Sequence, residues 1–181
     1  MVARQTRRED CRLEKKNRSK EARAPESMHK QVDPNVVPSD EAWGNLGDLD
    51  IKHAYRVFGG KTRNEVQASF TRSVIERADE LRFMPSAVFP YYMLAFRDHV
   101  EFGHFDVREA GDVFSCYLQL IEERARKDRD SIAAIHDQLA ISISRVARSQ
   151  DAFNIDRSIY GDFEDREKEI NRLLNTRAPR R

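Results

Sequence analysis

The chain has 181 residues, which is enough for one domain. Of these residues 39% are hydrophobic and 35% are charged, which is too polar a composition for a membrane protein. No apolar run approaches the roughly 18 residues of a membrane helix, and the N-terminus lacks the apolar segment of a secretory signal. We therefore expect a cytoplasmic protein that does not contact membranes. Cys11 and Cys116, the only two cysteines, predict no disulfide framework.

The formal charge of +1 is unevenly distributed along the chain. Ten basic and five acidic side chains give the first thirty residues about +5, which leaves −4 for the rest. Residues 1–42 also contain no Phe, Trp or Tyr, so they cannot bury enough apolar surface to offset the entropy of ordering them. We predict a disordered basic tail over 1–42. Its residues 4–23 are a candidate nucleic-acid contact through phosphate neutralisation, although no aromatic side chain is present to stack on bases.

A helical domain is predicted over residues 43–176, and its first two helices follow one another closely. The first covers about 49–58 and ends at Gly59-Gly60, because glycine accepts the left-handed conformation after a helix. The second begins at Thr62-Arg63-Asn64-Glu65, which has the form of a capping box. The second helix carries one apolar stripe, made by Val66, Phe70, Val74, Ala78 and Leu81.

The most apolar stretch of the chain is "ELRFMPSAVFPYYMLAFRDHV", residues 80–100. Pro85 ends the second helix, and Pro90 fits the first turn of a third helix over 90–102, where its missing N–H leaves no bond unmade. That helix is far too short to span a membrane. We interpret it as a buried helix of a small bundle, with a pocket wall or a partner groove as the alternative.

Three further helices are predicted over 107–127, 131–150 and 163–175, with Asp162 as the N-cap of the last. Residues 151–162 read as a loop, and 177–181 as a frayed C-terminus. No segment alternates with the period of a strand. The sequence therefore predicts an all-α, compact bundle of five or six helices.

The segment "RDHVEFGHFD" gathers side chains that can ligate metals, namely Asp98, His99, Glu101, His104 and Asp106, of which all but Glu101 are taken as candidate ligands. Zinc-binding helices present histidines four residues apart, whereas these two are five apart with Gly103 between them. A polar helix end is the simpler interpretation, and a metal-dependent enzyme with ligands in 98–106 is kept as an alternative. No cofactor is predicted.

Other residues that could bind ligands or take part in catalysis have simpler structural interpretations. Lys61 and Arg63 beside a helix start form a candidate anion site, but "FGGKT" lacks the spacing of a phosphate-binding loop. His53 and His136 have no nucleophile at a motif spacing. Cys116 lies among apolar residues and reads as a small buried side chain.

Residues 83–96 read F-x-P-x-x-x-F-x-Y-Y-x-x-A-F, which resembles a motif of small bacterial all-α proteins of unknown function. The resemblance rests on apolar positions, departs by one extra residue before Phe89, and implies no activity. Some members of that group lie near toxin and immunity genes, which favours a binding role. The matching residues are Phe83, Pro85, Phe89, Tyr91, Tyr92, Ala95 and Phe96.

The sequence shows no catalytic constellation, so we predict a non-enzymatic helical protein-interaction module, regulatory or immunity-like. It would bind another protein through a groove beside Tyr91, Tyr92 and Phe96, or through acidic residues of the domain. A nucleic-acid-associated regulator using residues 4–23 is the first alternative, and the metal-dependent enzyme is the second. The oligomeric state is left open.

Overall fold

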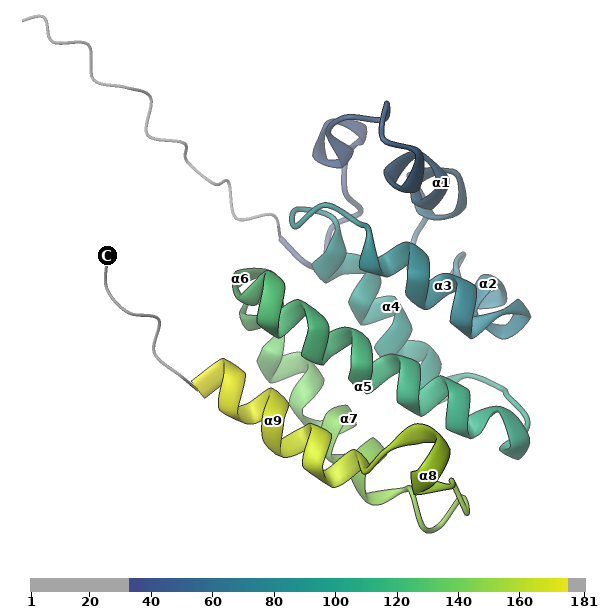
Figure 1. Cartoon of the computed structure of the whole chain (residues 1–181). Coiled ribbons are helices and arrows are strands. Elements are labelled where there is room, and N and C mark those ends of the chain that lie inside the picture. Colours follow the sequence, from purple (N-terminus) through teal and green to yellow (C-terminus); the bar gives the residue numbers. More distant parts are fainter. Residues whose placement is uncertain (1–32, 176–181) are drawn as a thin grey trace, which may run out of the picture. The chain divides into compact units, whose positions relative to one another are not determined.

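The computed structural model of the chain describes residues 33–175, and these are helical with no strand (Figure 1). The predicted all-α class is therefore confirmed. The predictions for residues 4–23, Cys11 and residues 177–181 lie outside the described residues. The elements, with η marking 3-10 helices, are η1 (Asp40–Trp43), α1 (Leu49–Phe58), α2 (Gln67–Arg72), α3 (Val74–Arg82), α4 (Phe89–Phe102), η2 (Val107–Glu109), α5 (Ala110–Lys127), α6 (Arg129–Ala133), α7 (His136–Arg148), α8 (Arg157–Tyr160) and α9 (Phe163–Asn175).

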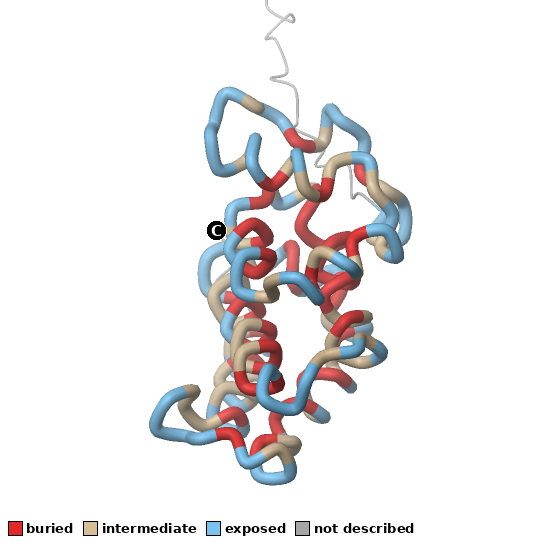
Figure 2. The backbone as a smooth tube through the Cα atoms, turned by 90° about the vertical axis from the view of Figure 1, so that its right-hand side faces the viewer, coloured by how far each residue is buried: buried red, intermediate tan, exposed pale blue. Residues whose placement is uncertain are grey.

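Helix α5 is the longest element, with 18 residues, and packs against α3 on one side and α9 on the other (Figure 1). Helix α7 packs against both α9 and α4. Buried residues follow the inner sides of these helices, while the connecting loops combine exposed, intermediate and buried residues (Figure 2). This arrangement follows from apolar stripes of period 3.6, which each helix can bury only against its neighbours.

Helix α4 is the central helix of this core. Its first eight residues, 89–96, are all buried, so the helix is enclosed on every side rather than along one stripe. Phe96 stacks on Phe70 of α2 with ring centroids 5.0 Å apart. Pro90 occupies the first turn of α4, as predicted. The interpretation of this segment as a core helix is confirmed.

Two tyrosine hydroxyls connect the core helices by hydrogen bonds. Tyr92 of α4 donates to the carbonyl of Phe58 at 2.6 Å, and its oxygen lies 3.1 Å from the carbonyl of Lys61. Tyr92 thereby ties α4 to the last residue of α1 and to the turn that follows it. The Tyr117 hydroxyl of α5 lies 2.6 Å from the hydroxyl of Ser142 in α7. These buried polar groups are paired, as a stable core requires.

The described residues form more helices than the five or six predicted, because two predicted helices are each divided and a short helix, α8, forms in a predicted loop. The predicted helix over 62–81 breaks at Ser73, whose backbone is extended and whose hydroxyl accepts from the N–H of Glu76 at 3.4 Å. The stretch from Ser73 to Glu76 has the form of a second capping box, which competes with helix continuation. The predicted start at Thr62 is wrong, because a turn over residues 63–66 precedes α2, although Thr62 and Glu65 make the predicted reciprocal bonds there.

The predicted helix over 131–150 is divided into α6 and α7 at Ala134 and Ile135. No proline or glycine signals this break. The apolar stripe of the predicted helix is nevertheless buried along α6 and α7, as its helical spacing indicates. The short helix α8 forms inside the predicted loop 151–162, where Asp156 accepts from the N–H of Ser158 at 2.7 Å. At the other end of the domain, Asp33 accepts from the N–H of Val36, so described contacts precede the predicted domain start at residue 43.

Candidate functional site

The aromatic residues expected to line a groove lie inside the core. Tyr91, Tyr92 and Phe96 are 4%, 0% and 0% exposed. The Tyr91 hydroxyl accepts the backbone N–H of Arg63 at 3.2 Å, so it stabilises the loop before α2. The prediction of a groove beside these rings is therefore wrong, because close packing around α4 leaves the rings no open face.

The two basic residues of the predicted anion site support this same loop. The ammonium of Lys61 donates to the carbonyl of Val57, which belongs to the last turn of α1. The guanidinium of Arg63 lies 5.5 Å from the centroid of the Tyr91 ring, and its Nε is 4.0 Å from a carboxylate oxygen of Asp98. Both side chains are thus engaged with the protein itself, and α2, with six residues, offers only a short helix start.

The four predicted metal ligands are separated by the fold. Asp98 pairs with Arg97 and lies beside Arg63. Asp106 caps η2, and the hydrogen-bonded Arg108 lowers the pKa of its carboxyl to about 2. His104 is exposed, whereas His99 is buried. Within residues 33–175, no group of three or more His, Cys, Asp or Glu side chains is placed to hold a metal ion.

The remaining chemically capable residues show no shared site. The exposed His53 has its Nε2 3.0 Å from Glu80, whose other carboxylate oxygen lies 2.7 Å from Arg77 Nε. Burial raises the pKa of the Glu80 carboxyl, while Arg77 and His53 oppose that shift. Cys116 is a free thiol whose pKa burial raises to about 11, which keeps it protonated and unreactive near pH 7.

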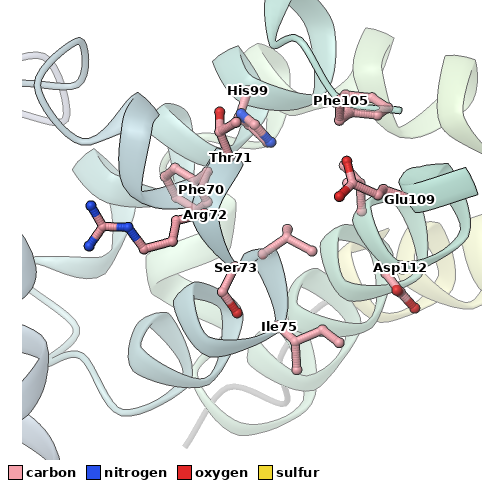
Figure 3. Close-up of a pocket in the computed structure, with 11 residues that line it drawn as sticks. Phe70, Thr71, Arg72, Ser73, Ile75, His99, Phe105, Glu109 and Asp112 are labelled. Carbon is pink, nitrogen blue, oxygen red and sulfur yellow. The ribbon is translucent and has the colours of Figure 1, made fainter. Parts of the chain in front are cut away.

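A pocket of about 140 Å³ lies where the α2–α3 junction faces the end of α4 and the start of α5 (Figure 3). Three local features of the sequence, each of which begins or ends a helix, form its walls. Ser73 separates α2 from α3, Gly103 ends α4, and the Asp106 capping box begins the turn into α5. The lining residues are Phe70, Thr71, Arg72, Ser73, Val74, Ile75, His99, Phe105, Glu109, Asp112 and Val113.

His99 is the unusual member of this pocket, which we call the His99 pocket. Its side chain lies between Phe70 and Phe105, with ring centroids 5.4 and 5.7 Å away, and only 1% of the residue is exposed. Neither ring nitrogen has a hydrogen-bond partner among the described residues. Burial lowers the pKa of the imidazole, and the nearby Glu109 carboxylate opposes that shift. His99 is therefore neutral near pH 7, with one donor and one acceptor nitrogen left unused.

Two carboxylates give the His99 pocket its charge. Glu109 accepts the backbone N–H of Asp106 at 3.0 Å and Asp112 accepts the Tyr160 hydroxyl at 3.1 Å, so each is held in place by one oxygen. Figure 3 shows the Glu109 carboxylate and the His99 ring pointing toward the same space, whereas Arg72 and the Asp112 carboxylate point away from it. Of the charged side chains in the lining, Glu109 therefore faces His99, while Asp112 adds a second negative charge at the edge of the pocket.

Exposed apolar side chains lie on the segments that border the pocket. Ile75, in the first turn of α3, lines the pocket and is 53% exposed. Phe102 and Val107, on either side of the loop that carries Phe105, are exposed as well. Exposed Ile159 belongs to α8, which the bond from Tyr160 to Asp112 holds against α5. Apolar exposure beside a pocket is typical of recognition sites.

A second pocket of about 220 Å³ lies between the end of α4, α5 and α7, and it differs in its polar groups. Its buried hydroxyl, Ser142, donates to the carbonyl of Leu139 at 2.8 Å and is paired with Tyr117. Its Arg145 lies 3.7 Å from Glu101. Since these groups already have partners, nothing in this pocket calls for a ligand.

Sequence reasoning identified His99 but assigned it to a metal site, and it missed Phe105, Glu109 and Asp112 as pocket residues. Two signals pointed to the location. Ser73-x-x-Glu76 and Asp106-x-x-Glu109 both have the pattern of a helix start, and both helix starts border the pocket. That these starts face each other depends on tertiary packing, which no local pattern contains.

No protein-family model, curated protein or solved structure matches the chain. The resemblance of residues 83–96 to a group of bacterial proteins therefore stays a prediction. Over residues 33–175, no helix combines the length and apolar character that crossing a membrane requires.

Proposed function

We propose that the chain is a non-enzymatic helical interaction module that binds another protein at the His99 pocket. The observation that supports this most is the buried imidazole at the base of an acidic pocket, with neither nitrogen hydrogen-bonded within the described chain. A buried polar group without a partner costs about 1–3 kcal/mol, and a bound ligand can supply the missing partner. Other buried nitrogens, such as Trp43 Nε1, also lack a partner among the described residues, but His99 lines a pocket where a ligand can reach it.

The position of the pocket supports a protein as that ligand. Ile75 contributes an exposed apolar side chain at the opening, and Phe102 and Val107 extend apolar surface along the adjoining loop. A partner that covers these side chains gains burial of apolar area at about 25 cal/mol per Å². A pocket beside an exposed apolar border is the arrangement in which one anchoring side chain of a partner is most effective.

The two alternatives gain no support from the described residues. The basic segment 4–23 of a nucleic-acid regulator lies outside them. The metal-dependent enzyme requires Asp98, His99, His104 and Asp106 to converge, and the fold separates these side chains.

The test compares immobilised wild-type protein with two double variants in capture from an extract of the source cells, followed by measurement with the purified partner. Ile75→Gln with Val107→Gln alters the apolar border, and Leu49→Gln with Ile141→Gln makes the same changes at exposed apolar residues of α1 and α7. We expect a partner that the wild type and the α1/α7 variant bind equally. The border variant should bind it about tenfold or more weakly.

Equal binding by all three proteins would place the interface elsewhere and contradict the proposal. Absence of any partner that withstands purification and rebinding would contradict it as well. Circular dichroism and thermal unfolding of the variants should match the wild type, because surface substitutions of this kind change stability by about 0.5 kcal/mol or less.

A further inference from the structure

The His99 pocket offers hydrogen-bond acceptors without a matching cation. Neutral His99 provides one acceptor nitrogen, and Glu109 and Asp112 provide carboxylate oxygens. Among the described residues, neither carboxylate forms a salt bridge, although ion pairs are frequent elsewhere on the same helix, as between Arg82 and Glu123. Arg72 is the only basic side chain of the lining, and it points away (Figure 3).

We propose that the His99 pocket receives the basic head group of a lysine or arginine side chain of the partner protein. The proposal rests on the proposed function and specifies the chemistry of that site. An ammonium or guanidinium group carries several N–H donors, so one group can donate to the imidazole nitrogen and to a carboxylate at the same time. The charge of the two carboxylates favours a cation over a neutral donor.

The walls of the pocket suit such a side chain. Phe105 is only partly buried, and a cation within about 6 Å of an aromatic face is attracted to it. The methylene stem of a lysine or arginine can lie along exposed Ile75 while its head enters the pocket, as long basic side chains do on apolar surfaces. The volume of about 140 Å³ lies below the roughly 300–1,000 Å³ typical of small-molecule sites, so it fits a head group better than a whole metabolite.

A metal ion fits the same acceptors less well. Metal ligands must converge to about 2.0–2.6 Å from one ion, and no group of three such side chains among residues 33–175 does so. An organic cation is larger and donates in several directions, so it does not require its acceptors to converge on one point.

The test is an NMR titration of the ¹⁵N-labelled full chain with N-acetyl-arginine amide, with N-acetyl-citrulline amide as the neutral analogue of the same shape. We expect saturable shifts for backbone amides lining the pocket, including Thr71, Ile75 and Val113. The neutral analogue should bind about tenfold or more weakly, and added salt should weaken the binding of the arginine derivative. N-acetyl-lysine amide should compete for the same site.

Two substitutions remove the charge while keeping the structural bond of each carboxylate. Glu109→Gln retains an oxygen for the N–H of Asp106, and Asp112→Asn retains one for the Tyr160 hydroxyl. The double variant should bind the arginine derivative about tenfold or more weakly. Asp130→Asn, on an exposed residue of α6, removes a charge elsewhere and should leave the titration unchanged.

Equal binding of the neutral analogue, unchanged binding by the double variant, or shifts away from the pocket would each overturn the proposal. Binding of spermidine without binding of either amino acid derivative would assign the site to a free polyamine and overturn it as well. The proposed function and this proposal are tested by different variants, so either can be refuted without the other. If Ile75→Gln with Val107→Gln abolishes partner binding while Glu109→Gln with Asp112→Asn does not, the interface stands and the basic side chain is refuted.

Discussion

The two ends of helix α4 differ in whether their buried polar side chains have hydrogen-bond partners. Near its N-terminal end, Tyr92 is fully buried and its hydroxyl bonds to the carbonyl of Phe58. Near its C-terminal end, His99 is equally buried, yet neither of its nitrogens has a partner among the described residues. One helix thus supplies both a polar contact that holds the fold together and a polar group that the fold leaves unsatisfied.

The difference shows which buried groups are structural and which point to a ligand. A buried group with a partner lowers the free energy of the folded chain, whereas one without a partner raises it. Stability therefore explains Tyr92 and does not explain His99. Exposed Ile75 lies at the His99 end, together with Glu109 and Asp112, whose carboxylates form no salt bridge among residues 33–175. This is the end at which we propose binding.

The largest expected effect is on the core that both ends share. Phe96→Ala should lower the free energy of unfolding by about 3–5 kcal/mol, because it leaves a cavity beside Phe70 and Tyr117. Phe102→Ala, made at a side chain of the same helix that is 73% exposed, should change it by about 0.5 kcal/mol or less. Urea unfolding followed by circular dichroism measures both, and similar losses in the two variants would contradict the assignment of α4 as the central helix.

The next effect concerns the satisfied end of α4. Tyr92→Phe removes the hydroxyl that bonds to the end of α1 and should cost about 1–2 kcal/mol, since it also leaves buried carbonyls without that donor. Tyr55→Phe makes the same chemical change at a hydroxyl bonded to exposed Asp40 and should cost about 0.5 kcal/mol or less. Equal losses in chemical denaturation would remove the contrast between buried and exposed hydroxyls.

A smaller change is expected at the unsatisfied end. His99→Leu breaks no hydrogen bond within the described chain, so the free energy of unfolding at pH 7.5 should stay within about 1 kcal/mol of the wild type. The same variant should lose binding of the arginine derivative. A loss of about 3 kcal/mol or more, as for a residue in a bonded network, would show that His99 is structural.

The pH dependence of stability sharpens the same contrast. Burial holds the pKa of folded His99 below the value near 6.5 of the unfolded chain, so in acid the unfolded chain binds a proton that the folded chain does not. The wild type should therefore lose stability as the pH falls below about 6.5, by up to about 1.4 kcal/mol per pH unit. His99→Leu should lose less over the same range. Identical pH profiles in thermal unfolding would contradict a neutral, buried imidazole.

Much of the fold follows from local patterns in the sequence. The stripe ending at Val146 and the cap at Asp162 placed the last helices, and α9 covers the predicted residues 163–175. Local patterns did not predict the helix breaks at Ser73 and Ile135. The first carried a capping pattern that the longer apolar stripe concealed. The second has no local signal and is a product of packing.

The candidate site was less predictable than the fold. The aromatic side chains of 83–96 correctly indicated a buried helix. The groove also predicted beside Tyr91, Tyr92 and Phe96 is not supported, because the enclosure of α4 buries these side chains. His99 was singled out for its neighbours in the sequence, Asp98 and His104, whereas its neighbours in space are Phe70, Phe105 and Glu109. These residues come from different elements, so their meeting depends on how the helices pack.

The most direct test of the central claim is the pair of imidazole ¹⁵N chemical shifts of His99, recorded with and without N-acetyl-arginine amide. We expect a neutral ring at pH 7 with one protonated nitrogen, and a change in the chemical shift of the unprotonated nitrogen when it accepts a hydrogen bond from the ligand. Unchanged shifts of both nitrogens at saturating ligand, or a ring already protonated at pH 7, would contradict it.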